Sequence, residues 1–250
     1  MNDNPLVSII VPLFNYEKYI AHCIRSIECQ SYDNWELIIT DDCSTDDSYN
    51  VAKSFENDKI RVLKTDINSG YSIAKNQAIK ASHGDYITCL DADDMMTKHS
   101  VSARLKFLID QGVDLVHARA ISVSGDISYE KCLKLTKPFK RDTPRIHAQT
   151  VLMKRSVHRD FGLYDEKLRS RADKEMWIRL FGKNCEGNHL VKKGFLNKDV
   201  AFYRKHGNSM MVNRRKDPNK QIALTNQLEQ SVKERCINGI NKTNTVFLES

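Results

Sequence analysis

The chain has 250 residues, of which 40% are hydrophobic and 28% charged, and its formal net charge is +7. A globular protein of one large or two small domains fits these values, whereas no run approaches the roughly 18 apolar residues of a membrane span and no signal-peptide pattern opens the sequence. The seven cysteines form no Cys-x-x-Cys pair, which argues against a disulfide framework or a zinc site, so we expect a cytoplasmic protein.

The first 115 or so residues alternate strand and helix patterns. Apolar runs predict strands, and periodic apolar residues or caps predict helices between them. The predicted strands cover residues 6–11, ended by Pro12, and 35–40, 60–63 and 86–90. The predicted helices cover residues 16–30, a segment that begins at a cap formed by Ser44 or Thr45, and residues 72–81. Ala74, Ala78 and Ala81 give the last of these helices a face of small residues that permits close packing. Such alternation predicts an α/β protein with a doubly wound, mostly parallel sheet.

The pattern changes after about residue 130. We expect a basic loop over 131–145, a strand over 146–153, a helix over 173–181 and a short strand over 200–204. The segment from 214 to the end is polar, and apolar residues within it predict one amphipathic C-terminal helix over 222–237.

Three carboxylates follow the predicted strand at 86–90. Asp91, Asp93 and Asp94 fall within four residues, where open α/β sheets place their ligands. Crowded carboxylates raise one another's pKa unless a cation lies between them. A hard ion such as Mn²⁺ or Mg²⁺ with phosphate co-ligands suits these oxygens. A solvated turn or a helix cap is the structural alternative.

Several stretches, in this order, together resemble inverting nucleotide-sugar glycosyltransferases of family 2, which have a GT-A fold. The resemblance covers roughly residues 5–210. It rests on residues 7–15, residues 35–46, residues 68–79, the Asp91-Ala92-Asp93-Asp94 element, residues 173–180 and residues 203–209.

The resemblance implies a donor site for a UDP-sugar in a Rossmann-like half, residues 1–115. Asp41 is then the acceptor of a uracil hydrogen bond, which suits a carboxylate because the imide is a donor. The other implied donor residues are Pro12, Asn15, Lys75, Asp91, Ala92, Asp93 and His206. Of these, Asp91, Asp93 and His206 are the implied metal ligands. Helix capping by Asp41 and solvent exposure of Lys75 or His206 are the alternatives.

The resemblance also implies a fused acceptor-binding half, residues 116–213, and makes Asp173 the catalytic base. Family members often carry Glu immediately before this Asp, whereas this chain has Ala172. Asp173 could instead only stabilise a helix N-terminus. Glu175 is the substitute base, and Arg179 could pair with a carboxylate.

The predicted activity is therefore metal-assisted transfer of a hexosyl or N-acetylhexosaminyl group, with inversion, to a hydroxyl of a glycan, lipid-linked glycan or protein. The alternative is a sugar-nucleotide-binding module whose catalysis has decayed, suggested by Ala172. A dinucleotide-dependent oxidoreductase is disfavoured because Pro12-Leu13-Phe14-Asn15, not Gly-x-Gly-x-x-Gly, follows the first strand. A sugar nucleotidyltransferase is disfavoured as well, because it would need a Gly-rich loop with Arg or Lys after the first strand, and the sequence has none at that position.

Charge divides unevenly along the chain. Residues 1–130 hold 12 Lys and Arg against 20 Asp and Glu, and residues 131–250 hold 27 against 12. The basic half suits a phosphate-bearing substrate or peripheral contact with the inner face of a membrane, although a solvated lysine-rich surface is the alternative. The scattered basic residues show no nucleic-acid-binding motif, and the oligomeric state is open.

Overall fold

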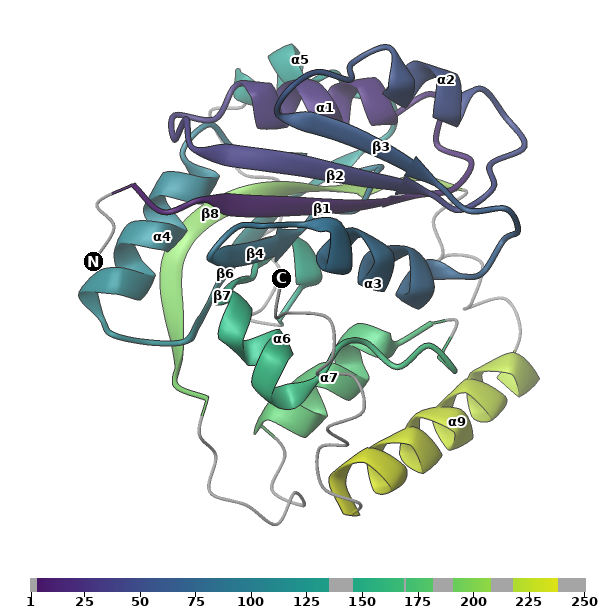
Figure 1. Cartoon of the computed structure of the whole chain (residues 1–250). Coiled ribbons are helices and arrows are strands. Elements are labelled where there is room, and N and C mark those ends of the chain that lie inside the picture. Colours follow the sequence, from purple (N-terminus) through teal and green to yellow (C-terminus); the bar gives the residue numbers. More distant parts are fainter. Residues whose placement is uncertain (1–3, 135–145, 169, 182–190, 208–217, 238–250) are drawn as a thin grey trace.

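The structure is a computed structural model and describes residues 4–134, 146–168, 170–181, 191–207 and 218–237. One eight-stranded sheet, in the order β3-β2-β1-β4-β7-β6-β8-β5, carries helices on both faces (Figure 1). The first four strands in this order are parallel and form the expected doubly wound half. They are β3 (Ile60–Lys64), β2 (Trp35–Asp41), β1 (Val7–Leu13) and β4 (Tyr86–Cys89).

The other four strands extend the same sheet. Strand β7 is antiparallel to both β4 and β6, whereas β6 and the long strand β8 run parallel and β5 pairs antiparallel with β8. These strands are β7 (Leu152–Lys154), β6 (Leu115–Ser124), β8 (Lys193–Lys205) and β5 (Met95–Met96). Their continuity with β4 joins both halves of the chain in one mixed sheet.

The apolar side chains of the sheet form two layers. Val7, Ile9 and Val11 of β1 pack with helices α1 (Ile20–Glu28), α2 (Ser48–Lys53) and α4 (Ser100–Asp110). Ile10 lies on the other face, where the core includes residues of α3 (Tyr71–Ala81), α6 (Arg155–Phe161), α7 (Ala172–Phe181) and α9 (Pro218–Ile237). Burial on both faces explains why these strands are continuously hydrophobic in sequence.

The C-terminal helix α9 lies along α7 (Figure 1). Leu228, which is 4% exposed, enters the shared core, whereas Ile222 remains 61% exposed. The predicted amphipathic helix is confirmed, but its apolar face is narrower than expected. Among the described residues, no helix is both long enough and apolar enough to cross a membrane.

Two predicted boundaries near the first loops are wrong. Pro12 does not end β1, because β4 has already ended beside Ile10 and a missing N–H at Pro12 costs no ladder bond on that side. The helix expected from residue 16 begins at Ile20. Residues 16–19 instead form a turn, whose first N–H donates to Ser48 Oγ at 2.8 Å.

The predicted cap at Ser44 or Thr45 is also wrong. Asn15 N donates to Ser44 Oγ at 3.0 Å, and Thr45 N donates to Asn15 Oδ1 at 2.8 Å. Asp46 takes over as the local acceptor, receiving the Ser48 N–H at 3.0 Å where α2 begins.

The prediction of one strand over 146–153 is wrong for most of its length. Thr150 N donates to His147 O at 3.0 Å and closes a short 3-10 turn, η1 (Ala148–Thr150), so the strand β7 begins only at Leu152. The predicted loop 131–145 begins inside a helix, α5 (Tyr129–Leu133), and its residues 135–145 lie outside the described residues. Helix α4 and strand β6 had no counterpart in the sequence prediction.

Candidate active site

The loops after β1, β2 and β4 meet at one edge of the sheet, as parallel strands require. Asp42 N donates to Leu13 O at 2.8 Å and so joins the first two loops. The N-terminus of α3 joins the others, because Gly70 N donates to Asp42 Oδ2 at 2.7 Å and Tyr71 Oη donates to Asp91 Oδ1 at 2.6 Å. Gly70 has a φ of 101°, which favours glycine at this junction.

Asp91, Asp93 and Asp94 converge at this edge. Each offers one carboxylate oxygen to a group whose members all lie within 4.8 Å of one another. Asp93 is 8% exposed and Asp94 is fully buried. Asp94 Oδ1 accepts the Arg204 N–H at 2.8 Å, but Asp94 Oδ2 is buried and has no hydrogen-bond partner among the described residues.

The electrostatics of this cluster favour a bound cation. Burial raises the pKa of Asp91 from its ordinary 3.8 to about 6, helped by the charge of Asp93 and opposed by Lys75 and Tyr71. Burial, followed by the charges of Asp93 and Asp91, also raises the pKa of Asp94 well above its ordinary value, against Arg204. An all-oxygen donor set with an unpaired buried oxygen fits Mn²⁺ or Mg²⁺.

The end of β8 brings His206 to this cluster from more than 110 residues away in sequence. His206 Nε2 lies 2.9 Å from Asp93 Oδ2, and the imidazole packs against the rings of Tyr19 and Tyr16, with centroids 4.8 and 5.9 Å away. Arg204, fully buried, donates Nε to Asp93 O at 2.8 Å. The structure thus groups the three residues expected to bind a metal.

Asp41 lies fully buried at the end of β2. Its Oδ2 accepts the Ser44 N–H at 3.1 Å, whereas Oδ1 is buried without a partner in the described part of the chain. An unpaired buried carboxylate oxygen is costly, so this atom suits a ligand that brings a donor. Pro12 is buried near the end of the neighbouring strand β1, and Asn15, at a φ of 56°, accepts the Thr45 N–H in the loop that follows.

Asp173 occupies the first turn of α7 and is joined to α3. Lys75 Nζ lies 2.5 Å from Asp173 Oδ1, and the lysine side chain is fully buried while that of Asp173 is 28% exposed. The structure therefore brings Lys75 to the expected base. Ala172 and Ala92 are both 1% exposed and pack into the core.

Glu175 is a structural residue. It is fully buried and pairs with Arg179 at 2.8 Å and with Arg235 of α9 at 3.6 Å. The expected pairing of Arg179 is confirmed.

Sequence reasoning missed Tyr71 and Arg204 as site residues. Tyr71 lies four residues before Lys75 on the same helix, and Arg204 falls inside the 203–209 motif. The helical spacing and the position next to His206 were signals that could have found both.

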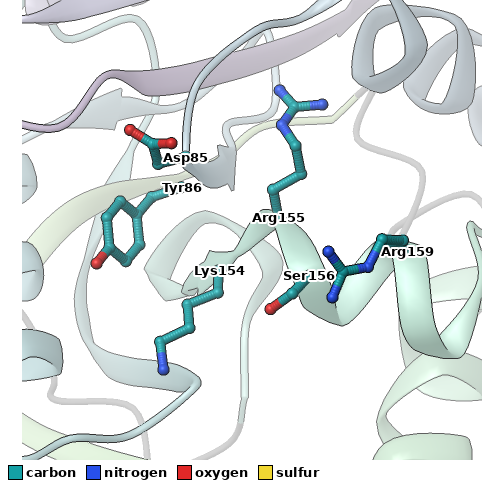
Figure 2. A pocket seen from close by; sticks show the side chains of 6 residues that line it. All are labelled: Asp85, Tyr86, Lys154, Arg155, Ser156 and Arg159. Atoms are coloured by element: carbon teal, nitrogen blue, oxygen red, sulfur yellow. The ribbon is translucent and has the colours of Figure 1, made fainter. Parts of the chain in front are cut away.

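A hollow of about 340 Å³ lies outside this cluster, where β4 and α6 begin, and Figure 2 shows the side chains that line it. Two of its cations form ion pairs: Lys154 lies 2.8 Å from Asp114, and Arg159 lies 2.7 Å from Asp160. Arg155 donates to Gly84 O at 2.6 Å and to Ser82 Oγ at 2.8 Å. Two of the three cations that line the hollow thus have carboxylate partners, and Arg155 donates to neutral acceptors.

Comparisons with known proteins place the chain among glycosyltransferases. The chain is 29% identical over 248 residues to the provisionally named teichuronic acid biosynthesis glycosyltransferase TuaG of Bacillus subtilis, covering 92% of this chain and 90% of that protein. It is 27% identical over 224 residues to the UDP-Glc:alpha-D-GlcNAc-diphosphoundecaprenol beta-1,3-glucosyltransferase WfaP of Escherichia coli, covering 85% and 82%.

Solved structures share the fold. The S. aureus protein TarS in complex with UDP-GlcNAc superposes with a TM-score of 0.69 at 20% identity, over 91% of this chain and 66% of that one. The mannosyltransferase PcManGT of Pyrobaculum calidifontis, in complex with GDP-Man and Mn²⁺, gives 0.64 at 17%, over 95% and 66%. The GT-A fold expected from the sequence is confirmed.

The family model described as glycosyl transferase family 2 matches residues 8–161. This match covers more than half of the chain and includes the loops of Asp41 and Asp91–Asp94. The protein therefore belongs to glycosyl transferase family 2.

Proposed function

We propose that this glycosyltransferase moves a hexosyl or N-acetylhexosaminyl group from a UDP-sugar to a hydroxyl acceptor, with inversion and with the help of a divalent metal. The observation that carries the proposal is the gathering of Asp91, Asp93 and Asp94 with His206 at the sheet edge that also holds Asp41. Residues 1–115 form the donor half and residues 116–213 the acceptor half.

The unpaired Oδ1 of Asp41 supports a uracil partner, because a carboxylate accepts the imide N–H. The names of two similar proteins, WfaP with UDP-Glc and TarS with UDP-GlcNAc, favour UDP as the nucleotide. Pro12, Asn15 and Ala92 belong to the walls of the same donor site.

Asp91, Asp93 and His206 would hold Mn²⁺ or Mg²⁺. When bound, the ion supplies positive charge that stabilises the diphosphate of the departing UDP. His206 Nε2 lies 2.9 Å from Asp93 Oδ2, so these two side chains are close enough to share a ligand.

Asp173 is the proposed general base. Its carboxylate removes the proton of the acceptor hydroxyl while that oxygen bonds to the anomeric carbon. The bond from the anomeric carbon to the phosphate oxygen breaks on the opposite face, and its electron pair leaves with UDP. Attack opposite the leaving group inverts the anomeric configuration.

The acceptor is proposed to be a glycan, a lipid-linked glycan or a protein. The name of WfaP, which includes a diphosphoundecaprenol-linked sugar, favours a lipid-linked acceptor. The excess of Lys and Arg in residues 131–250 also supports a cytoplasmic protein that binds peripherally to the inner face of the membrane.

A nucleotide-sugar screen tests the proposal. We expect UDP and at least one UDP-sugar, but not GDP-Man, to raise the melting temperature in the presence of Mn²⁺, and that UDP-sugar to give UDP release with mixed hydroxyl acceptors. If a UDP-sugar raises the melting temperature but no acceptor gives UDP release, the alternative of a binding module whose catalysis has decayed is favoured. A response to GDP-Man alone would refute the UDP assignment.

Replacing Asp173 separates binding from chemistry. Asp173→Asn should keep the Kd for UDP but lower kcat by about 10²–10⁴-fold, because the proton acceptor is lost. The same change removes the charge partner of Lys75, so the melting temperature of the variant is measured alongside. Asp160→Asn, an exposed carboxylate that pairs with its neighbour Arg159, is the control and should not change kcat. A parallel loss of UDP binding in Asp173→Asn would make Asp173 structural.

A further inference from the structure

Lys75 has an unusual environment for a lysine. The side chain is fully buried, and its ammonium lies 3.8 Å from the ring centroid of Tyr164 and 4.7 Å from that of Tyr71. These two rings and the carboxylate of Asp173 surround the charge. Asp173 is partly exposed, so its carboxylate faces solvent on one side and the buried ammonium of Lys75 on the other.

The charge of Lys75 is kept despite its burial. Burial alone disfavours an ammonium, but the adjacent carboxylate of Asp173 overcomes that effect, so the pKa of Lys75 lies well above its ordinary value. A pair of this kind gains little net stability, because desolvation offsets the attraction. Fold stability is therefore a weak reason for placing a lysine here.

The same lysine lies next to the donor side. Tyr71 Oη is 3.4 Å from Lys75 Nζ and donates to Asp91 Oδ1 at 2.6 Å. Tyr71 and Lys75 are one helical turn apart on α3, so a single rigid element contacts both Asp91 and Asp173. The contact of Lys75 with Asp173 Oδ1 leaves the second oxygen, Oδ2, for an acceptor hydroxyl.

We propose that Lys75 is a positioning residue for the reaction: it anchors Asp173 by Oδ1 and, with Tyr71, sets the base relative to Asp91. This inference rests on the proposed function, in which Asp173 is the base. Lys75 then acts through Asp173 and not through the nucleotide. Its removal lowers the rate of transfer without weakening the donor complex.

A double-mutant cycle on the full chain tests this role. Lys75→Met should lower kcat by about 100-fold, since a displacement of about 1 Å at a reacting group has an effect of that size. Its KM for the UDP-sugar and Kd for UDP should stay within about twofold of wild type. In the Asp173→Asn background, Lys75→Met should change the remaining rate by less than about threefold, because the two residues act as one unit.

Conservative and control variants complete the cycle. Lys75→Arg keeps the charge and should retain more activity than Lys75→Met, a rescue that a packing role alone does not predict. Lys80→Met removes a lysine from the exposed part of the same helix and should keep kcat. Lys75→Gln repeats the comparison if Lys75→Met does not fold.

The outcomes distinguish this inference from the proposed function. An inactive Asp173→Asn beside a fully active Lys75→Met would overturn the role of Lys75 alone. Equal losses in UDP affinity and kcat for Lys75→Met, or a full further loss in the Asp173→Asn background, would also overturn it. A fully active Asp173→Asn would instead overturn the proposed base.

Discussion

Asp91, Asp93 and Asp94 are acidic groups held together in a largely buried site, and their surroundings only partly offset the repulsion between their charged forms. Arg204 contacts the backbone of Asp93 and Asp94 Oδ1, while Tyr71 donates to Asp91. One oxygen of Asp94 remains unpaired among the described residues. A cation between these carboxylates would offset their repulsion.

The raised pKa of Asp91 predicts that metal binding depends on pH. Because the carboxyl has a pKa of about 6, a proton competes with Mn²⁺ below that pH. We expect the Kd for Mn²⁺ to be about tenfold weaker at pH 5 than at pH 7, as protonation of one such group requires. Isothermal titration at both pH values measures this, and equal affinities would contradict the assigned role of Asp91.

The same shift predicts how the metal-free protein responds to pH. The folded carboxyl keeps its proton up to about pH 6, whereas the unfolded one loses it near its ordinary 3.8. Native protein therefore binds more protons between these values, so the contribution of Asp91 to the free energy of unfolding decreases as the pH rises from about 4 to 6. Urea unfolding should show this decrease in the wild type and a smaller one in Asp91→Asn.

Replacing Asp93 tests the metal site by removing one of its proposed ligands. Asp93→Ala should abolish Mn²⁺-dependent turnover and the rise in melting temperature with Mn²⁺, because it removes a carboxylate that also contacts His206. Asp110→Ala, a surface change on α4 beside Lys106, is the control. Ordinary metal-dependent activity in Asp93→Ala would exclude Asp93 as a ligand.

Helix α3 organises the site at the level of elements. Besides Tyr71 and Lys75, it presents Ser72, whose Oγ donates to Leu168 O at 2.5 Å, and Asn76, whose Nδ2 donates to Tyr164 O at 2.9 Å. These bonds fix the segment that leads to α7 and Asp173. Helix α3 thereby links the Asp91 loop to the segment before α7.

Helix α9 supports α7 from outside, which predicts a measurable effect on stability. Leu228→Ala should lower the free energy of unfolding by about 2–3 kcal/mol, since it opens a cavity in a buried cluster. Ile222→Ala, on the same helix but largely exposed, should change it by less than about 0.5 kcal/mol. Chemical denaturation of both variants measures the difference, and equal effects would contradict the packing of α9.

The sequence could predict the repeating elements and the acidic edge, because apolar periodicity and strand order are local signals. The parallel strands, α3, α7 and α9 follow from them. It could not predict the loops, where long-range bonds decide the outcome: Ser44 bonds to Asn15 instead of capping α2. The Lys75–Asp173 contact joins residues 98 positions apart, so no local pattern predicts it.

The uneven distribution of charge along the chain predicts electrostatic binding to an anionic membrane surface. The excess of Lys and Arg in residues 131–250 should give binding to vesicles containing anionic phospholipid that disappears at high salt. Vesicles of neutral phosphatidylcholine are the control in the sedimentation assay. Equal partitioning to both vesicle types would reject peripheral contact by charge.

One continuous sheet brings Asp41, the carboxylates of Asp91–Asp94 and His206 to a common edge, and the proposed reaction depends on a cation there. A crystal structure with UDP and Mn²⁺ tests this most directly. We expect anomalous density for manganese between the carboxylates of Asp91 and Asp93 and the diphosphate, with the uracil against Asp41. Manganese elsewhere, or carboxylates turned away from a bound nucleotide, would contradict the account.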